Sequence, residues 1–184
     1  MEQTLESPPP PSQSQRSGRM VGLFWIEAEE VFLGVPPVAP IPGVLLSPTG
    51  LQITGADPQS WPWSTVMDVE VTEVPVRSAV TRWATRAATV AAAVLDFWVP
   101  GSPPEMTVTV STMQGEHHHT PVLSGAATAY TQREVDLSHA LLAHFVRGSA
   151  SPGALTAWWK ETQPVEVLRS RQREAVLEHW LAKA

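Results

Sequence analysis

Apolar side chains recur with two different spacings in different parts of this chain, and the order of these parts limits the folds that the chain can adopt. Residues 67–72 and 106–111 alternate between apolar and polar side chains, which is typical of strands with one buried face. Residues 131–147 carry apolar side chains at three- and four-residue steps, which is typical of an amphipathic helix. Because strands come first and most helices come last, the chain is expected to fold as an α+β protein.

Turn residues between short apolar segments predict further strands. Residues 21–26 and 31–34 are apolar and aromatic, whereas the loop at 35–43 is too rich in proline to pair inside a sheet. Residues 44–47 and 50–54 flank a Ser-Pro-Thr-Gly turn, so they are expected to form a hairpin.

Helix signals begin in the middle of the chain. A first helix is predicted over residues 78–98, where it interrupts the strands. Thr131 and Glu134 have the spacing of a capping box, in which the hydroxyl and the carboxylate each bond the other residue's backbone N–H. This box begins the predicted helix at 131–147, and Gly148 is expected to end it as the C′ residue.

These patterns divide the chain into three parts. Residues 1–19 have almost nothing to bury and are predicted to be a disordered Pro/Ser/Gln tail. Residues 20–147 form the domain, and residues 148–184 form a helical C-terminal extension. The extension is predicted to hold a short helix at 154–162 and a last helix that begins at Pro164.

A family resemblance rests on three short segments. The segment Leu-Leu-Ser-Pro-Thr-Gly-Leu-Gln-Ile at 45–53, with Trp-Pro-Trp-Ser at 61–64 and Asp-Val-Glu-Val at 68–71, resembles bacterial proteins with a pleckstrin-homology-like fold. In that family an L-T-x-x-G-L strand–turn–strand is followed by a W-x-x-I-x-x-V strand, and Val66 or Met67 stands here at the isoleucine position. The whole chain is also similar to uncharacterised proteins of high-GC Gram-positive bacteria.

The resemblance implies a bent antiparallel sheet or barrel, closed at one end by the helix at 131–147, with 78–98 as an inserted helix. The family usually has seven strands, and not all seven are evident in this sequence. Members of the family that bind lipids bind the lipid phosphates with Lys and Arg side chains of the first hairpin loop. The corresponding loop here, at 34–43, has no basic residue, so phosphoinositide binding is not expected.

Charge and composition argue against several functions. The formal charge of −6 opposes binding to nucleic acid. Arg169, Arg171 and Arg173 spread over more than one face of the last helix and are expected to be solvated. The chain has no cysteine, which excludes disulfides and thiolate chemistry. The acidic first residues and the lack of an apolar run of roughly 20 residues predict a cytoplasmic protein.

Three consecutive histidines are the only metal-like motif. They lie in residues 116–123, which are expected to form the return strand of a hairpin. On a strand His117 and His119 face one side and His118 faces the other. A His-x-His pair can chelate zinc, but a catalytic site needs a third ligand, so we expect no metal site and keep His117 and His119 as weak candidates. The sequence contains no cofactor-binding fingerprint, and we expect the protein to use no cofactor.

Eight tryptophans are many for 184 residues, and three of them lie in the extension. Indole is enriched at interfaces because it buries a large area and keeps one polar atom. Trp158, Trp159 and Trp180 are therefore candidates for a partner-binding site, and the alternative is that they cover their own domain. Within that alternative, we expect Trp158 or Trp159 to be buried and Trp180 to be more exposed.

The sequence as a whole predicts a non-catalytic cytoplasmic interaction or scaffold module that binds another protein. The binding element would be a sheet edge, the inserted helix or the extension, since an open edge can accept a partner strand. One alternative is a peripheral membrane protein that uses the basic and apolar helix at 77–99. The remaining alternative is a metal-dependent enzyme centred on the histidines.

Overall fold

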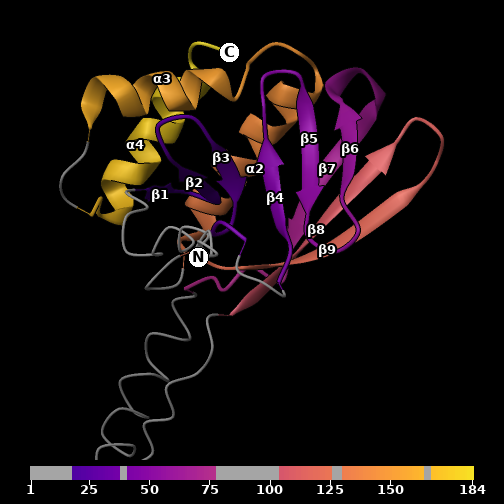
Figure 1. Ribbon diagram of the computed structural model, residues 1–184. Coiled ribbons are helices and arrows are strands. Elements are labelled where there is room, and N and C mark those ends of the chain that lie inside the picture. The colour runs from indigo at the N-terminus through magenta and orange to yellow at the C-terminus, as the bar shows by residue number, and fades with distance from the viewer. Residues whose placement is uncertain (1–17, 38–40, 78–103, 126–129, 164–166) are drawn as a thin grey trace, which may run out of the picture.

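The computed structural model describes residues 18–37, 41–77, 104–125, 130–163 and 167–184 (Figure 1). Within these residues the chain forms two antiparallel sheets, of six and three strands, followed by three α-helices. The predicted α+β class is confirmed. The predicted tail up to residue 17 and the predicted helix at 78–98 lie outside the described residues, as does all of the 77–99 segment except Arg77.

The six-stranded sheet is a meander in which each strand pairs with the next one along the chain. The predicted hairpin at 44–54 is confirmed, because Val44 pairs with Ile53. The first strand begins at Arg19, one residue before the predicted start of the domain. The strands are β1 (Arg19–Val21), β2 (Phe24–Ile26), β3 (Val31–Leu33), β4 (Gly43–Leu46), β5 (Gly50–Thr54) and β6 (Gln59–Pro62).

A short 3-10 turn, η2 (Trp63–Thr65), carries the chain from β6 into the three-stranded sheet. This sheet consists of β7 (Val66–Thr72), β8 (Glu105–Thr112) and β9 (His117–Leu123). The predicted alternation holds along β8 and in the second half of β7. Met67, which the alternation placed on the buried face, is instead 63% exposed, because a bulge between Val66 and Asp68 shifts the register.

The two sheets meet where β3 ends and β9 ends. The Val35 N–H donates to the Leu123 carbonyl at 3.0 Å. Gly34 has φ +75°, and a Cβ on it would lie 2.4 Å from the Leu123 carbonyl oxygen, so only glycine allows this approach. The described strands nevertheless remain two separate sheets, and the predicted closure into a barrel is wrong.

Helix α2 (Gln132–Val146) packs against β7 and against the last helix of the chain. Both hydrogen bonds of the predicted Thr131–Glu134 capping box are present, and Gly148 follows the helix with φ +71°. Its buried face contributes Leu141, Leu142 and Phe145 to a core that also contains side chains from both sheets. The helix predicted at 131–147 is confirmed.

The C-terminal extension folds back onto the domain as α3 (Gly153–Thr162) and α4 (Ser170–Leu181). The predicted helix at 154–162 is confirmed, but the last helix does not begin at Pro164. The chain at Arg169 is extended, with ψ 158°, and α4 starts at the next residue. Helix α4 packs against α2 and β1 (Figure 1). Among the described residues, no helix combines the length and the apolar character that crossing a membrane requires.

Candidate functional site

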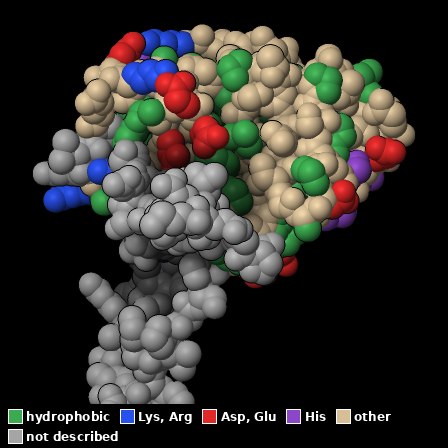
Figure 2. All heavy atoms as spheres, viewed as in Figure 1, with side chains coloured by type: hydrophobic (Ala, Val, Ile, Leu, Met, Phe, Trp, Pro, Cys, Tyr) green, Lys and Arg blue, Asp and Glu red, His purple; other side chains and the backbone are tan. Residues whose placement is uncertain are grey.

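The histidines of β9 point to opposite faces of the small sheet, as the sequence predicted. His117 Nδ1 lies 2.9 Å from the Ser111 hydroxyl, and His119 Nδ1 lies 3.0 Å from the Thr109 hydroxyl. On the other face, the His118 ring lies 4.6 Å from the Trp61 ring. In Figure 2, histidine and acidic side chains gather at the end of the molecule that β8 and β9 form.

His117 and His119 lie on the exposed face of the three-stranded sheet, and each belongs to a row of three residues across it. In one row Asp68 of β7 pairs with Ser111 of β8, which pairs with His117; in the other, Glu70, Thr109 and His119 follow the same order. A hydrolytic triad needs the acid to contact the imidazole. Here the hydroxyl stands between them, and the acid and imidazole are two strand spacings apart, about 9–10 Å. Among the described residues, no group of three or more His, Cys, Asp or Glu is placed to hold a metal.

Replacing His117 and His119 together by glutamine is expected to change the free energy of unfolding by less than about 0.5 kcal/mol. Both side chains are exposed and bond only a neighbouring hydroxyl, and such surface substitutions cost little. Urea unfolding of the double variant measures this change. We also expect no stoichiometric zinc in untagged protein purified without added metal, and zinc that disappears in the double variant would contradict this.

The backbone of β9 presents a second feature, which concerns hydrogen bonding along its outer edge. Residues of an antiparallel strand direct their N–H and C=O groups alternately toward the partner strand and away from it. Glu116 accepts from Thr112 across the hairpin, and Leu123 accepts from Val35 on the other side. By this alternation the backbone groups of His117, His119 and the Pro121 carbonyl point away from β8. Within the described part of the chain, no backbone bond to another segment reaches these three residues. We call this stretch the free edge of β9.

A groove of about 430 Å³ runs beside the free edge of β9. Its opposite wall is the end of the β5–β6 hairpin, with Ile53, Asp57 and Gln59. The Gln59 side-chain oxygen is buried and has no hydrogen-bond partner within the described part of the molecule. The groove therefore offers acceptor groups on one wall and backbone groups of both kinds on the other.

The three tryptophans of the extension do not form an exposed patch. Trp159 is 8% exposed and Trp180 is 6% exposed, and both belong to the core. The half-buried Trp158 packs edge-to-face on Trp180, with ring centroids 5.5 Å apart. The expectation that Trp158 or Trp159 is buried is confirmed, and the expectation that Trp180 is exposed is wrong. Trp180 does not fray with the terminus because α4 lies across α2 and β1.

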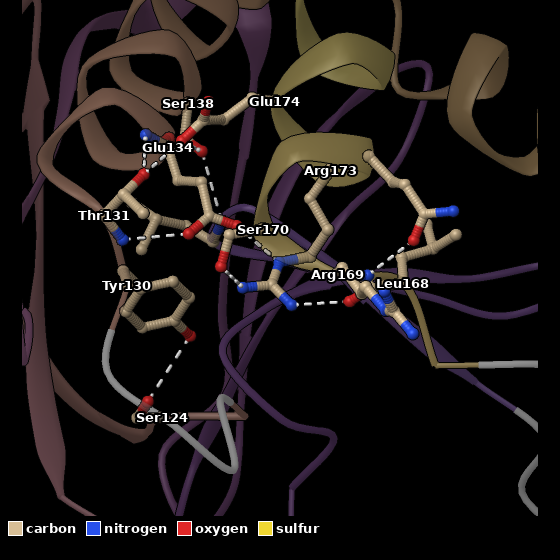
Figure 3. A network of polar contacts seen from close by, with 12 residues as sticks. Ser124, Tyr130, Thr131, Glu134, Ser138, Leu168, Arg169, Ser170, Arg173 and Glu174 are labelled. Carbon is tan, nitrogen blue, oxygen red and sulfur yellow. Dashed lines mark hydrogen bonds and ion pairs between the residues drawn. The ribbon is translucent and has the colours of Figure 1, made fainter.

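A buried ion pair that the sequence did not predict joins α2 to α4 (Figure 3). Glu134 is fully buried and accepts from Arg173 Nε and, at 2.9 Å, from the Thr131 backbone N–H. Arg173 also donates to the Leu168 carbonyl at 2.7 Å and to the Ser170 hydroxyl at 3.2 Å. The expectation that Arg173 is solvated is therefore wrong.

An exposed ion pair joins the same two helices. Arg133 of α2 contacts Glu178 of α4, and the pKa of Arg133 is raised, first by the hydrogen bond to Glu178 and then by the charge of that carboxylate. Both pairs use adjacent residues in the first turn of α2 and connect that turn to α4. No local pattern indicates either pair, because the partners are 39 and 45 residues apart.

Comparison with known proteins gives no relative: no family model matches the chain, and neither the curated proteins nor the solved structures provide a match. The resemblance to pleckstrin-homology-like proteins therefore stays a prediction.

Proposed function

We propose that this chain is a non-catalytic interaction module that binds another protein, and that the partner adds an extended segment to the free edge of β9. The observation that carries the proposal is the free edge itself, with a groove of about 430 Å³ beside it. Strand addition supplies affinity through backbone hydrogen bonds and specificity through side chains that fit adjacent pockets. Residues 117–121 support both parts of this proposal, because their outward backbone groups lie beside the groove.

The length of the edge limits the strength of the interaction. His117 and His119 each offer one N–H and one C=O, and Pro121 offers only its carbonyl, because proline has no N–H. Each backbone bond contributes about 0.5–1.5 kcal/mol net. The edge alone therefore gives modest affinity, and Pro121 limits extension of the pairing in that direction.

The groove indicates which partner side chain would fit. Asp57 and the unsatisfied oxygen of Gln59 are both acceptors, and they lie on the same wall. Asp57 is exposed on this wall, and a carboxylate forms strong hydrogen bonds with cationic donors, so a donor from the partner would be favoured there. We therefore propose that the partner segment carries a Lys, Arg or amide side chain facing this wall.

We also propose that the fold belongs with the pleckstrin-homology-like domains. Support comes from two antiparallel sheets followed by a helix that covers them, in the order which the resemblance implies. The nine described strands exceed the family's usual seven.

His119→Pro tests the proposed function, because it removes an outward N–H while leaving the pairing of β9 with β8 intact. The matched control, His119→Gln, changes the same side chain and keeps the N–H. Immobilised full-length protein is exposed to native lysate of the source organism, and retained proteins are identified by mass. Wild type and His119→Gln are expected to retain the same partner, and His119→Pro is expected to lose it.

Two outcomes contradict the proposed function. One is a His119→Pro variant that melts at the wild-type temperature and still retains the partner. The other is a wild-type protein that enriches no protein above uncoated resin.

A further inference from the structure

A second cavity, of about 500 Å³, lies between β1, β2 and the start of α4. Four arginines line it: Arg19, Arg77, Arg169 and Arg173. They come from three separate stretches of the chain. We call it the arginine cavity.

The arginine cavity is positively charged, whereas the chain as a whole is negatively charged. Four of the twelve basic residues of a protein with net charge −6 line this one cavity, and no acidic residue belongs to its described lining. Arg173 is neutralised by Glu134, and Arg19 lies over the Trp159 ring, 5.9 Å from its centroid. Arg77 and Arg169 are exposed and have no carboxylate within ion-pair distance in the described structure. Like charges held near one another repel, and an anion between them would relieve that repulsion.

The lining of the arginine cavity also includes apolar side chains, those of Met20, Trp25 and Leu168, which we call its apolar wall. A bound molecule would therefore contact both hydrocarbon and guanidinium groups. A volume of about 500 Å³ lies within the usual range of small-molecule sites. Guanidinium forks match the paired oxygens of carboxylates and phosphates.

We propose that the arginine cavity binds a small organic anion, in which a carboxylate or phosphate is attached to an aromatic or aliphatic group. Arg77 and Arg169 hold the anionic group, and the apolar wall takes the hydrocarbon. Arg173 is already fixed by Glu134, Leu168 and Ser170, so its position needs no reorganisation when the ligand arrives. This site is independent of the proposed strand addition at β9, which involves other residues.

The site is tested by calorimetric titration of the full-length protein with phenyl phosphate, benzoate, inorganic phosphate and benzyl alcohol. We expect saturable binding of phenyl phosphate or benzoate, and the tighter of the two identifies the anionic group. Inorganic phosphate is expected to bind more weakly because it lacks the hydrocarbon. Benzyl alcohol is expected not to bind because it lacks the charge.

Substitution of the arginines shows whether the binding occurs in this cavity. The Arg77→Gln, Arg169→Gln double variant is expected to weaken binding at least about tenfold, since each loses a charge-assisted hydrogen bond. Arg171→Gln is the matched control: Arg171 is exposed in the first turn of α4, two residues after Arg169, and is not part of the cavity lining, so its loss should leave the affinity unchanged. Because none of the three arginines has a described ion-pair partner, all variants are expected to fold.

Three results would overturn the proposal. The first is no saturable binding of either aromatic anion at millimolar concentration. The second is equal affinity for the double variant and the wild type. The third is equal affinity for phenyl phosphate and inorganic phosphate, or for benzoate and benzyl alcohol, because the apolar wall or the arginines would then contribute nothing.

Discussion

Replacing Glu134 by glutamine is expected to lower the free energy of unfolding by about 3–5 kcal/mol, the usual cost of breaking a buried ion pair by removing one partner. Glu134 is fully buried, and its oxygens accept from Arg173 and from the Thr131 backbone N–H. Glutamine has nearly the same shape but carries no charge. The variant therefore leaves the guanidinium of Arg173, which is 8% exposed, without a counter-charge.

Glu178→Gln is the matched control for this measurement. Glu178 pairs with Arg133 across the same two helices, but the two side chains are 46% and 64% exposed. Ion pairs at the surface are screened by solvent and contribute little, so the control should cost much less than Glu134→Gln. Urea unfolding of both variants gives the comparison. A loss of unfolding free energy in Glu134→Gln no larger than that in Glu178→Gln would contradict the prediction.

A second variant separates the charge from the packing at this position. Replacing Glu134 by leucine and Arg173 by methionine together removes both charges and keeps an apolar volume. Since buried pairs often exchange for apolar residues without loss, the double variant should be more stable than Glu134→Gln. The same stability for both variants would show that the hydrogen bonds, and not the uncompensated charge, dominate the cost.

Features that depend on neighbouring residues could be predicted from this sequence. The Thr131–Glu134 capping box lies within one helical turn, and the alternation along β8 is a property of the strand itself. Both are present as expected. Pro121 also marks β9 as an edge strand, because proline in a central strand would remove a ladder hydrogen bond.

Features that depend on distant pairing could not be predicted. Met67 is exposed because the register against β8 shifts at a bulge, and one strand alone carries no signal of its partner's register. The sequence predicts Glu134 as a capping residue. Its buried ion pair with Arg173 forms only when α4 packs on α2, which no local pattern indicates. The arginine cavity likewise gathers Arg19, Arg77 and Arg169 from stretches that are far apart in the sequence.

Trp180→Ala is expected to cost about 3–5 kcal/mol of unfolding free energy, as truncation of a buried tryptophan does. Trp180 is 6% exposed and packs edge-to-face on Trp158, with ring centroids 5.5 Å apart. Trp158→Ala loses the same aromatic contact, worth about 0.5–1.5 kcal/mol, but Trp158 is only half-buried. The cost of Trp180→Ala should therefore exceed that of Trp158→Ala.

Urea unfolding of the two single variants and the double variant measures both costs and their coupling. Equal or reversed costs would contradict this prediction. Arg173 lies in helix α4 and Arg169 is its N-cap residue, so docking of the helix through Trp180 helps to hold these two arginines at the arginine cavity. Trp180→Ala should consequently weaken phenyl phosphate binding even where the variant remains folded, although Trp180 does not line the cavity. Unchanged phenyl phosphate affinity in a folded Trp180→Ala variant would show that α4 is held in place without this tryptophan.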